Sequence, residues 1–128
     1  MTVRLAVGPR TVALAAAFAQ RFAERAGLDG ETAHRLTLVV EELIANVVEH
    51  GAAPEAGRVV LRLERAGQGA RLSLSDGGVA FDPRTMEDAG PNLERGGGAG
   101  IALIRGWSEI ESYSRRGGRN RLALRLRS

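Results

Sequence analysis

The sequence lacks two residue types entirely and is poor in two others. It contains no cysteine, which excludes disulfide bonds and thiolate metal sites. All 18 basic residues are arginine, so chemistry that needs lysine is excluded as well: a Walker A phosphate loop, the strand lysine of protein kinases or a Schiff base. With only two histidines, a histidine metal cluster is not expected. Aromatic residues make up 4%, so Leu, Val, Ile and Ala must build the core.

Long apolar runs and a strong net charge are missing too. No stretch is long enough for a membrane span or a signal peptide, so we expect a cytoplasmic protein without membrane contact. The length of 128 residues, 44% of them hydrophobic, suits one domain over residues 1–128. The net charge is only +3, although arginines gather near the C-terminus. An alternating strand with arginine on its solvent face explains that cluster better than nucleic-acid binding, because no aromatics interleave with the charges.

Hydrophobic periodicity predicts eight regular elements. Period-two alternation predicts strands, and a period near 3.6 predicts helices. The expected strands cover 2–7, 58–65, 70–76, 109–114 and 120–127, and the expected helices cover 10–26, 30–50 and 99–106. We therefore predict an α/β (α+β) two-layer sandwich: a mixed, mostly antiparallel sheet with about three helices on one face. Residues 77–100 are rich in glycine and read as a long functional loop with one helical turn near 85–88.

The helix predicted over 30–50 carries polar residues beside its apolar face. Asp29 is placed as its N-cap and Gly51 as its C-terminal cap. The stripe formed by Glu42, Asn46 and His50 at intervals of four lies on the flank of the apolar face, not opposite it. Asparagine is a poor residue for a helix interior, so a partner outside the helix is expected to use Asn46. The apolar positions are Leu36, Val40, Leu43 and Val47.

Two further polar clusters follow in the chain. Residues 76–83 leave a strand as Asp-Gly-Gly, where a carboxylate acceptor stands next to backbone that a ligand can approach closely. We expect Asp76 to contribute little packing at this strand end. Residues 96–101 run from three glycines into a helix start, where backbone amides favour an anion. With an oxygen ligand for Mg²⁺ from Asn46, these parts suit a magnesium–nucleotide site. Taken singly, each also fits a simpler interpretation: a turn, a flexible loop or a satisfied buried amide.

Together the three clusters resemble the motifs of the ATP-binding fold shared by gyrase, MutL and histidine kinases, the Bergerat-type fold. Within that superfamily the chain looks most like the small bacterial anti-sigma factor serine/threonine kinases. Glu42-x-x-x-Asn46-x-x-x-His50-Gly51 matches the N box. Asp76-x-Gly78-x-x-Phe81-Asp82-Pro83 matches the G1 box, and Gly97-Gly98-x-Gly100-Ile101 matches the G2 box. The resemblance covers nearly the whole chain.

The resemblance implies a role for each motif. Asn46 would hold Mg²⁺, and Glu42 would be the general base for an attacking hydroxyl. Asp76 would accept a hydrogen bond from the adenine amino group, with Gly78 letting the base approach. Further nucleotide-binding positions implied by the motifs are Phe81, the lid arginine Arg95, the phosphate-facing Gly98 and Gly100, and Ile101.

By the same resemblance, the protein would be a serine/threonine protein kinase with ATP and Mg²⁺ as cofactors. Its substrate would be a STAS-type anti-anti-sigma protein, its second partner a sigma factor, and it would form a homodimer. Two rival hypotheses stay open: a non-catalytic module whose partner surface is gated by nucleotide, and a detached histidine-kinase catalytic domain. No dimerisation helix with an acceptor histidine precedes the domain, which counts against the second rival. His34 is expected to be a surface residue.

Overall fold

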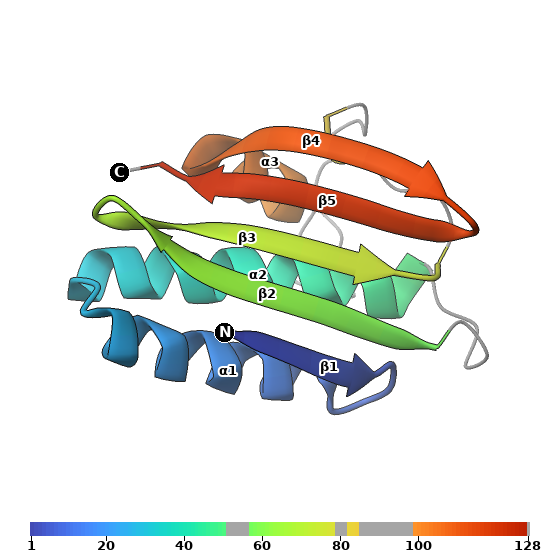
Figure 1. Ribbon diagram of the computed structural model, residues 1–128, viewed down its shortest axis with the longest axis horizontal. Coiled ribbons are helices and arrows are strands. Elements are labelled where there is room, and N and C mark those ends of the chain that lie inside the picture. The colour runs from blue at the N-terminus through green and yellow to red at the C-terminus, as the bar shows by residue number, and fades with distance from the viewer. Residues whose placement is uncertain (51–56, 79–81, 85–98, 128) are drawn as a thin grey trace.

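The computed structural model has one five-stranded sheet with helices on one side, and it describes residues 1–50, 57–78, 82–84 and 99–127 (Figure 1). The strands follow the order β1-β2-β3-β5-β4, and every pairing among them is antiparallel. This confirms the predicted two-layer α+β architecture, with element ends shifted by one or two residues, but the sheet is wholly antiparallel and not mixed. The predicted turn at 85–88 and the cap at Gly51 lie outside the described residues. The elements are β1 (Thr2–Ala6), α1 (Thr11–Ala26), α2 (Gly30–His50), β2 (Arg58–Ala66), β3 (Gly69–Asp76), α3 (Ala99–Trp107), β4 (Ser108–Arg116) and β5 (Arg119–Leu126).

Local chemistry fixes the junction between the first two helices. Gly27 ends α1 in the left-handed conformation, with φ of 69°, which glycine adopts without steric cost. Asp29 caps α2 as predicted, because its Oδ1 accepts a hydrogen bond of 2.7 Å from the backbone N–H of Thr32. That N–H stabilises the ionised carboxylate and lowers the pKa of Asp29. The chain therefore turns sharply between α1 and α2, and the two helices pack side by side beneath the sheet (Figure 1).

The core lies between the sheet and the helices. The predicted apolar face of α2 is confirmed, because all four of its positions are buried. They pack against the inward-facing leucines and valines of β2, β3 and β5. Such an apolar face stabilises a helix mainly through tertiary packing. The four positions are Leu36, Val40, Leu43 and Val47.

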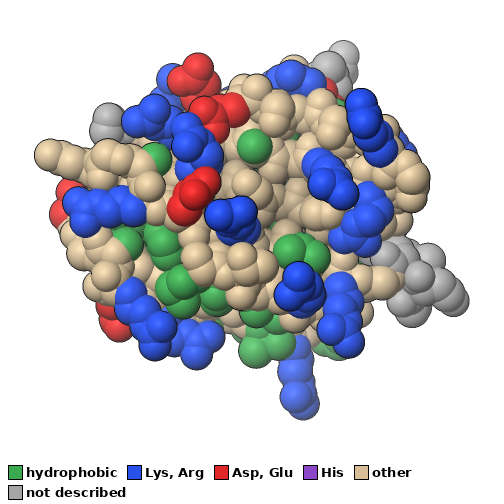
Figure 2. All heavy atoms as spheres, in the orientation of Figure 1, with side chains coloured by type: hydrophobic (Ala, Val, Ile, Leu, Met, Phe, Trp, Pro, Cys, Tyr) green, Lys and Arg blue, Asp and Glu red, His purple; other side chains and the backbone are tan. Residues whose placement is uncertain are grey.

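The opposite face of the sheet carries arginine, as the alternation in the sequence predicts. On β5, Arg121 and Arg125 are exposed while Leu122 and Leu124 are buried. Figure 2, which views the molecule from the sheet side, shows basic side chains spread over this face. None of the described helices is long and apolar enough to cross a membrane.

Candidate functional site

The polar flank of α2 supplies the first part of the site. Asn46 is only 4% exposed although it lies one turn from the half-buried Glu42. Both side chains sit beside the buried Leu43 and Val47, at the border of the apolar face. The predicted stripe is therefore present for these two residues. His50 ends α2, and its side chain lies outside the described residues.

The end of β3 supplies a buried carboxylate. Asp76 is 7% exposed and continues the inward alternation of Leu72 and Leu74, so its side chain lies on the face covered by the helices. Its Oδ1 accepts a hydrogen bond of 2.9 Å from the backbone N–H of Gly78. Asp76 and Gly78 are thus in direct contact. The expectation that Asp76 contributes little packing is wrong, because the strand end is buried rather than solvated.

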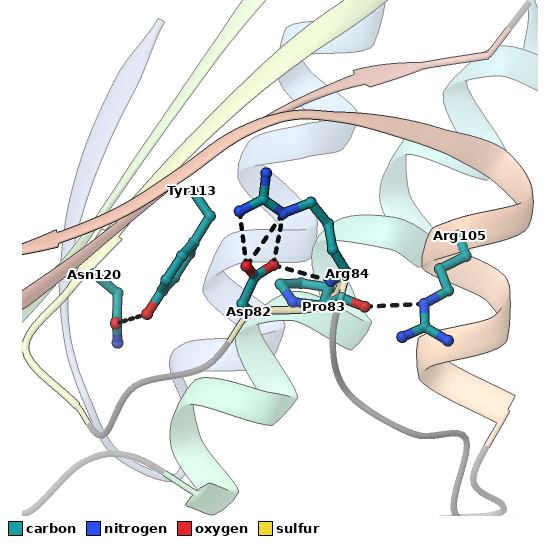
Figure 3. A network of polar contacts seen from close by, with 6 residues as sticks. All are labelled: Asp82, Pro83, Arg84, Arg105, Tyr113 and Asn120. Atoms are coloured by element: carbon teal, nitrogen blue, oxygen red, sulfur yellow. Dashed lines mark hydrogen bonds and ion pairs between the residues drawn. The ribbon is translucent and has the colours of Figure 1, made fainter.

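A strand distant in sequence holds this carboxylate from the side. Asn120 on β5 is the register partner of Asp76, is 2% exposed, and donates a hydrogen bond of 3.2 Å from Nδ2 to Asp76 Oδ1. The side-chain oxygen of Asn120 accepts from the Tyr113 hydroxyl and, at 2.9 Å, from Arg115 Nη1. The same Arg115 nitrogen donates to the carbonyl oxygen of Gly78 at 2.8 Å. Figure 3 shows the bond between Tyr113 and Asn120.

The segment that continues the second motif is fixed by two arginines (Figure 3). Arg84 forms a two-pronged ion pair with Asp82, with Nη2–Oδ2 of 2.8 Å and Nε–Oδ1 of 3.0 Å. This guanidinium stabilises the carboxylate and lowers the pKa of Asp82. Arg105 on α3 donates from Nε to the carbonyl oxygen of Pro83 at 2.9 Å. The link ties the second motif to the helix that follows the third.

The described parts of the three motifs lie on α2, at the end of β3 and in the first turn of α3. In Figure 1, α2 and β3 end on the same side, and α3 runs from that side towards the start of β4. Gly100 is buried in the first turn of α3, and Ile101 lies in the same helix. The remaining predicted residues, Phe81, Arg95 and Gly98, lie outside the described residues.

Four residues of this region were not predicted from the sequence. For Asn120 a signal exists, because it shares the inward alternation of Leu122, Leu124 and Leu126 and is thus a polar residue on a core face. No comparable signal points to the other three, which act through contacts distant in the chain. These are Arg105, Tyr113 and Arg115.

Comparison with known proteins agrees with the resemblance that the three motifs suggest. The family model described as a histidine kinase-like ATPase domain matches residues 5–126. The serine/threonine-protein kinase BtrW of Bordetella bronchiseptica is 30% identical over 133 residues, which cover 96% of this chain and 90% of BtrW.

Two solved structures share the fold. A structure of the RsbU and RsbW domains of Rv1364c from Mycobacterium tuberculosis has a TM-score of 0.62 at 18% identity, over 99% of this chain and 32% of that chain. The SiaB–SiaC complex from Pseudomonas aeruginosa has a TM-score of 0.60 at 14% identity, over 98% of this chain and 88% of that chain. The family predicted from the three motifs is therefore confirmed: this chain belongs to the histidine kinase-like ATPase domains.

Proposed function

We propose that this protein is a Mg-ATP-dependent serine/threonine protein kinase that also sequesters a partner protein. The observation that carries the proposal is the buried Asp76 carboxylate, whose two hydrogen bonds both fall on Oδ1. Oδ2 accepts no hydrogen bond within the described part of the chain, so it can accept one from the amino group of adenine. A fixed acceptor of this kind selects adenine over a 6-oxo purine.

The transfer step is assigned to the flank of α2. As the serine oxygen of the substrate forms a bond to the γ-phosphorus of ATP, Glu42 takes the hydroxyl proton. The bond from that phosphorus to the β–γ bridging oxygen breaks, and ADP leaves. Such a reaction depends on positioning and charge neutralisation more than on covalent chemistry by the protein. The half-buried position of Glu42, one turn from Asn46, supports this assignment.

The donor set near Asn46 fits magnesium better than a transition metal. A buried amide oxygen is a hard ligand, and Mg²⁺ takes few protein ligands because it keeps waters and phosphate oxygens. Among the described residues, no group of three histidine, cysteine or acidic side chains could hold a metal. We propose that Asn46 holds the ion, which when bound neutralises charge on the nucleotide phosphates.

The partner proposal rests on relatives. BtrW is named as a serine/threonine-protein kinase, and SiaB, with this fold, was solved in complex with SiaC. We propose that the substrate is a serine on a STAS-type anti-anti-sigma protein and that the second partner is a sigma factor. We further propose that the chain acts as a single cytoplasmic domain that forms a homodimer.

Glu42→Gln tests the kinase assignment. It keeps the size of the side chain but removes the anion, so phosphorylation of the partner should fall by about 10²–10⁴-fold while ATP binding persists. The measurement is transfer of label from γ-labelled ATP to a partner already shown to bind by calorimetry. The matched control is Glu41→Gln, a half-buried neighbour that helix geometry turns about 100° away.

Three results would contradict the proposal. Label that reaches no bound partner with the wild-type protein would favour the nucleotide-gated binding module. Equal labelling by the wild type and Glu42→Gln would remove the general base. Label on a histidine of another chain, detected as acid-labile phosphate, would favour the detached histidine-kinase domain.

A further inference from the structure

Three polar side chains of the hairpin formed by β4 and β5 lie near the end of β3. Tyr113 and Arg115 come from β4 and Asn120 from β5, and all three lie on the inward side of the hairpin, as their pairing with Leu122, Asn120 and Asp76 requires. A tight turn at Gly117 and Gly118, with φ of 58° and 74°, joins the two strands. Asn120, a residue that the motifs do not contain, thus contacts the carboxylate proposed to bind adenine.

The direction of each hydrogen bond follows from the chemistry of the groups. A guanidinium can only donate, so Arg115 Nη1 must meet the oxygen of the Asn120 amide and not its nitrogen. The Tyr113 hydroxyl donates to the same oxygen. With two donors on the oxygen side, the NH₂ group of Asn120 is turned towards Asp76. The amide therefore has one orientation, in which it donates to the carboxylate.

This orientation fixes the carboxylate in turn. Asp76 Oδ1 receives two donors, Asn120 Nδ2 at 3.2 Å and the Gly78 N–H at 2.9 Å, which come from different elements of the fold. Two donors on one oxygen restrict rotation of the carboxylate plane and direct Oδ2 away from both. Arg115 restrains Gly78 as well, since its Nη1 also donates a hydrogen bond to the carbonyl oxygen of Gly78.

We propose that Asn120, oriented by Tyr113 and Arg115, is a positioning residue that sets how strongly Asp76 selects adenine over 6-oxo purines. This inference rests on the proposed function, because it assumes that Asp76 Oδ2 accepts from the 6-amino group. The hairpin does not touch the base in this scheme. It acts through the angle at which the carboxylate meets the base.

A purely structural role would have a different signature. If the three side chains only satisfied one another's hydrogen bonds in the core, their loss would lower the stability of the fold and weaken the binding of all nucleotides alike. If they position Asp76, their loss should weaken the binding of ATP more than the binding of inosine triphosphate (ITP), which differs at the 6-position. The ratio of the two affinities therefore separates the roles, and preorganised hydrogen bonds determine that ratio.

The experiment uses variants that leave Asn120 in place. Tyr113→Phe and Arg115→Met each remove one donor to the amide oxygen, and the double variant removes both. We expect each single variant to lower the ATP/ITP affinity ratio by about twofold or less and the double variant by about tenfold. The loss in the double variant would then exceed the product of the losses in the two single variants, as expected when Tyr113 and Arg115 both orient Asn120. Asn120→Ala should lower the ratio by about tenfold or more.

The matched control is Arg116→Met. Arg116 is an exposed residue on the same strand, its register partner is Arg119, and its loss should leave the ratio unchanged. Affinities are measured by calorimetry, and thermal melts show which variants are folded. If Asn120→Ala does not fold, the double variant still decides the question.

The outcomes separate this inference from the proposed function. A double variant with the wild-type ratio, in a protein whose Asp76→Asn variant loses selection, would overturn the inference alone. Failure of the wild-type protein to prefer ATP over ITP would overturn both. A drop confined to the Tyr113, Arg115 and Asn120 variants would support the positioning role.

Discussion

Replacement of Asp76 tests the centre of the proposed site, and two substitutions make different predictions. Asp76→Ala removes the acceptor of two buried hydrogen bonds, from Gly78 N and Asn120 Nδ2. A buried donor left without its acceptor costs about 1–3 kcal/mol, so the free energy of unfolding should fall by about 2–6 kcal/mol. At about 4 °C per kcal/mol for a domain of this size, the melting temperature should drop by roughly 8–24 °C.

Asp76→Asn keeps an oxygen for those two donors and should cost stability much less. Its NH₂ group would then stand where Oδ2 is proposed to face the base. A donor opposite the amino group of adenine is repulsive, so ATP affinity should fall by about 10²-fold or more. The same donor suits the 6-oxo group of inosine or guanosine triphosphate, so the preference between ATP and ITP should reverse.

Thermal melts followed by calorimetry with ATP and ITP measure both effects. If Asp76→Asn is folded and binds ATP as tightly as the wild type, the nucleotide pocket is assigned to the wrong carboxylate. If Asp76→Ala melts at the wild-type temperature, the two hydrogen bonds do not have the weight given to them here. The control is Ser75→Ala, which changes the neighbouring residue on the opposite face of the same strand.

Two further predictions concern the metal and the sheet. Asn46→Ala should weaken Mg-ATP binding much more than magnesium-free ATP binding, and calorimetry with and without EDTA checks this; equal losses would remove the metal role. Glu111 accepts hydrogen bonds from Arg71, which lowers its pKa below the ordinary 4.5. The pair should therefore add stability at neutral pH, and this contribution is lost as the pH falls below about 4.5 through the folded-state pKa. Urea unfolding of the wild type and Arg71→Met should differ at pH 7 and converge as the pH falls through the folded-state pKa of Glu111, and a constant difference would contradict the pairing.

Much of the fold could be predicted because its signals are local. The apolar positions of α2 follow helical spacing, so the buried face could be predicted from the sequence without knowledge of what covers it. Asp29 and Gly27 mark a helix start and a helix end through contacts within a few residues. The ends of the elements shifted by a residue or two because hydrogen-bond ladders, not periodicity, decide where a strand stops.

The candidate site could be predicted only in part, for a physical reason. Motif spacing predicts Glu42, Asn46 and Asp76 as site residues, since each stands at a recognisable place on a helix flank or a strand end. The partner of Asp76 is Asn120, 44 residues away, and that contact depends on which strands pair and in what register. Alternation assigns a residue to a face of a strand, but it does not say which strand lies beside it.

The strand order explains why the last hairpin reaches the site. After β3 the chain passes through α3 and returns along β4, so β5 fills the place beside β3 and β4 becomes the edge. Because β3 and β5 are antiparallel, the end of β3 lies beside the start of β5, and Asp76 meets Asn120 there. A carboxylate buried under α2 must be hydrogen-bonded, and the adjacent strand can supply a side-chain donor at that depth. The hydrogen bond between Asp76 and Asn120 thus lets the central strand β3 end in a buried acceptor, which is the geometry that the proposed recognition of adenine requires.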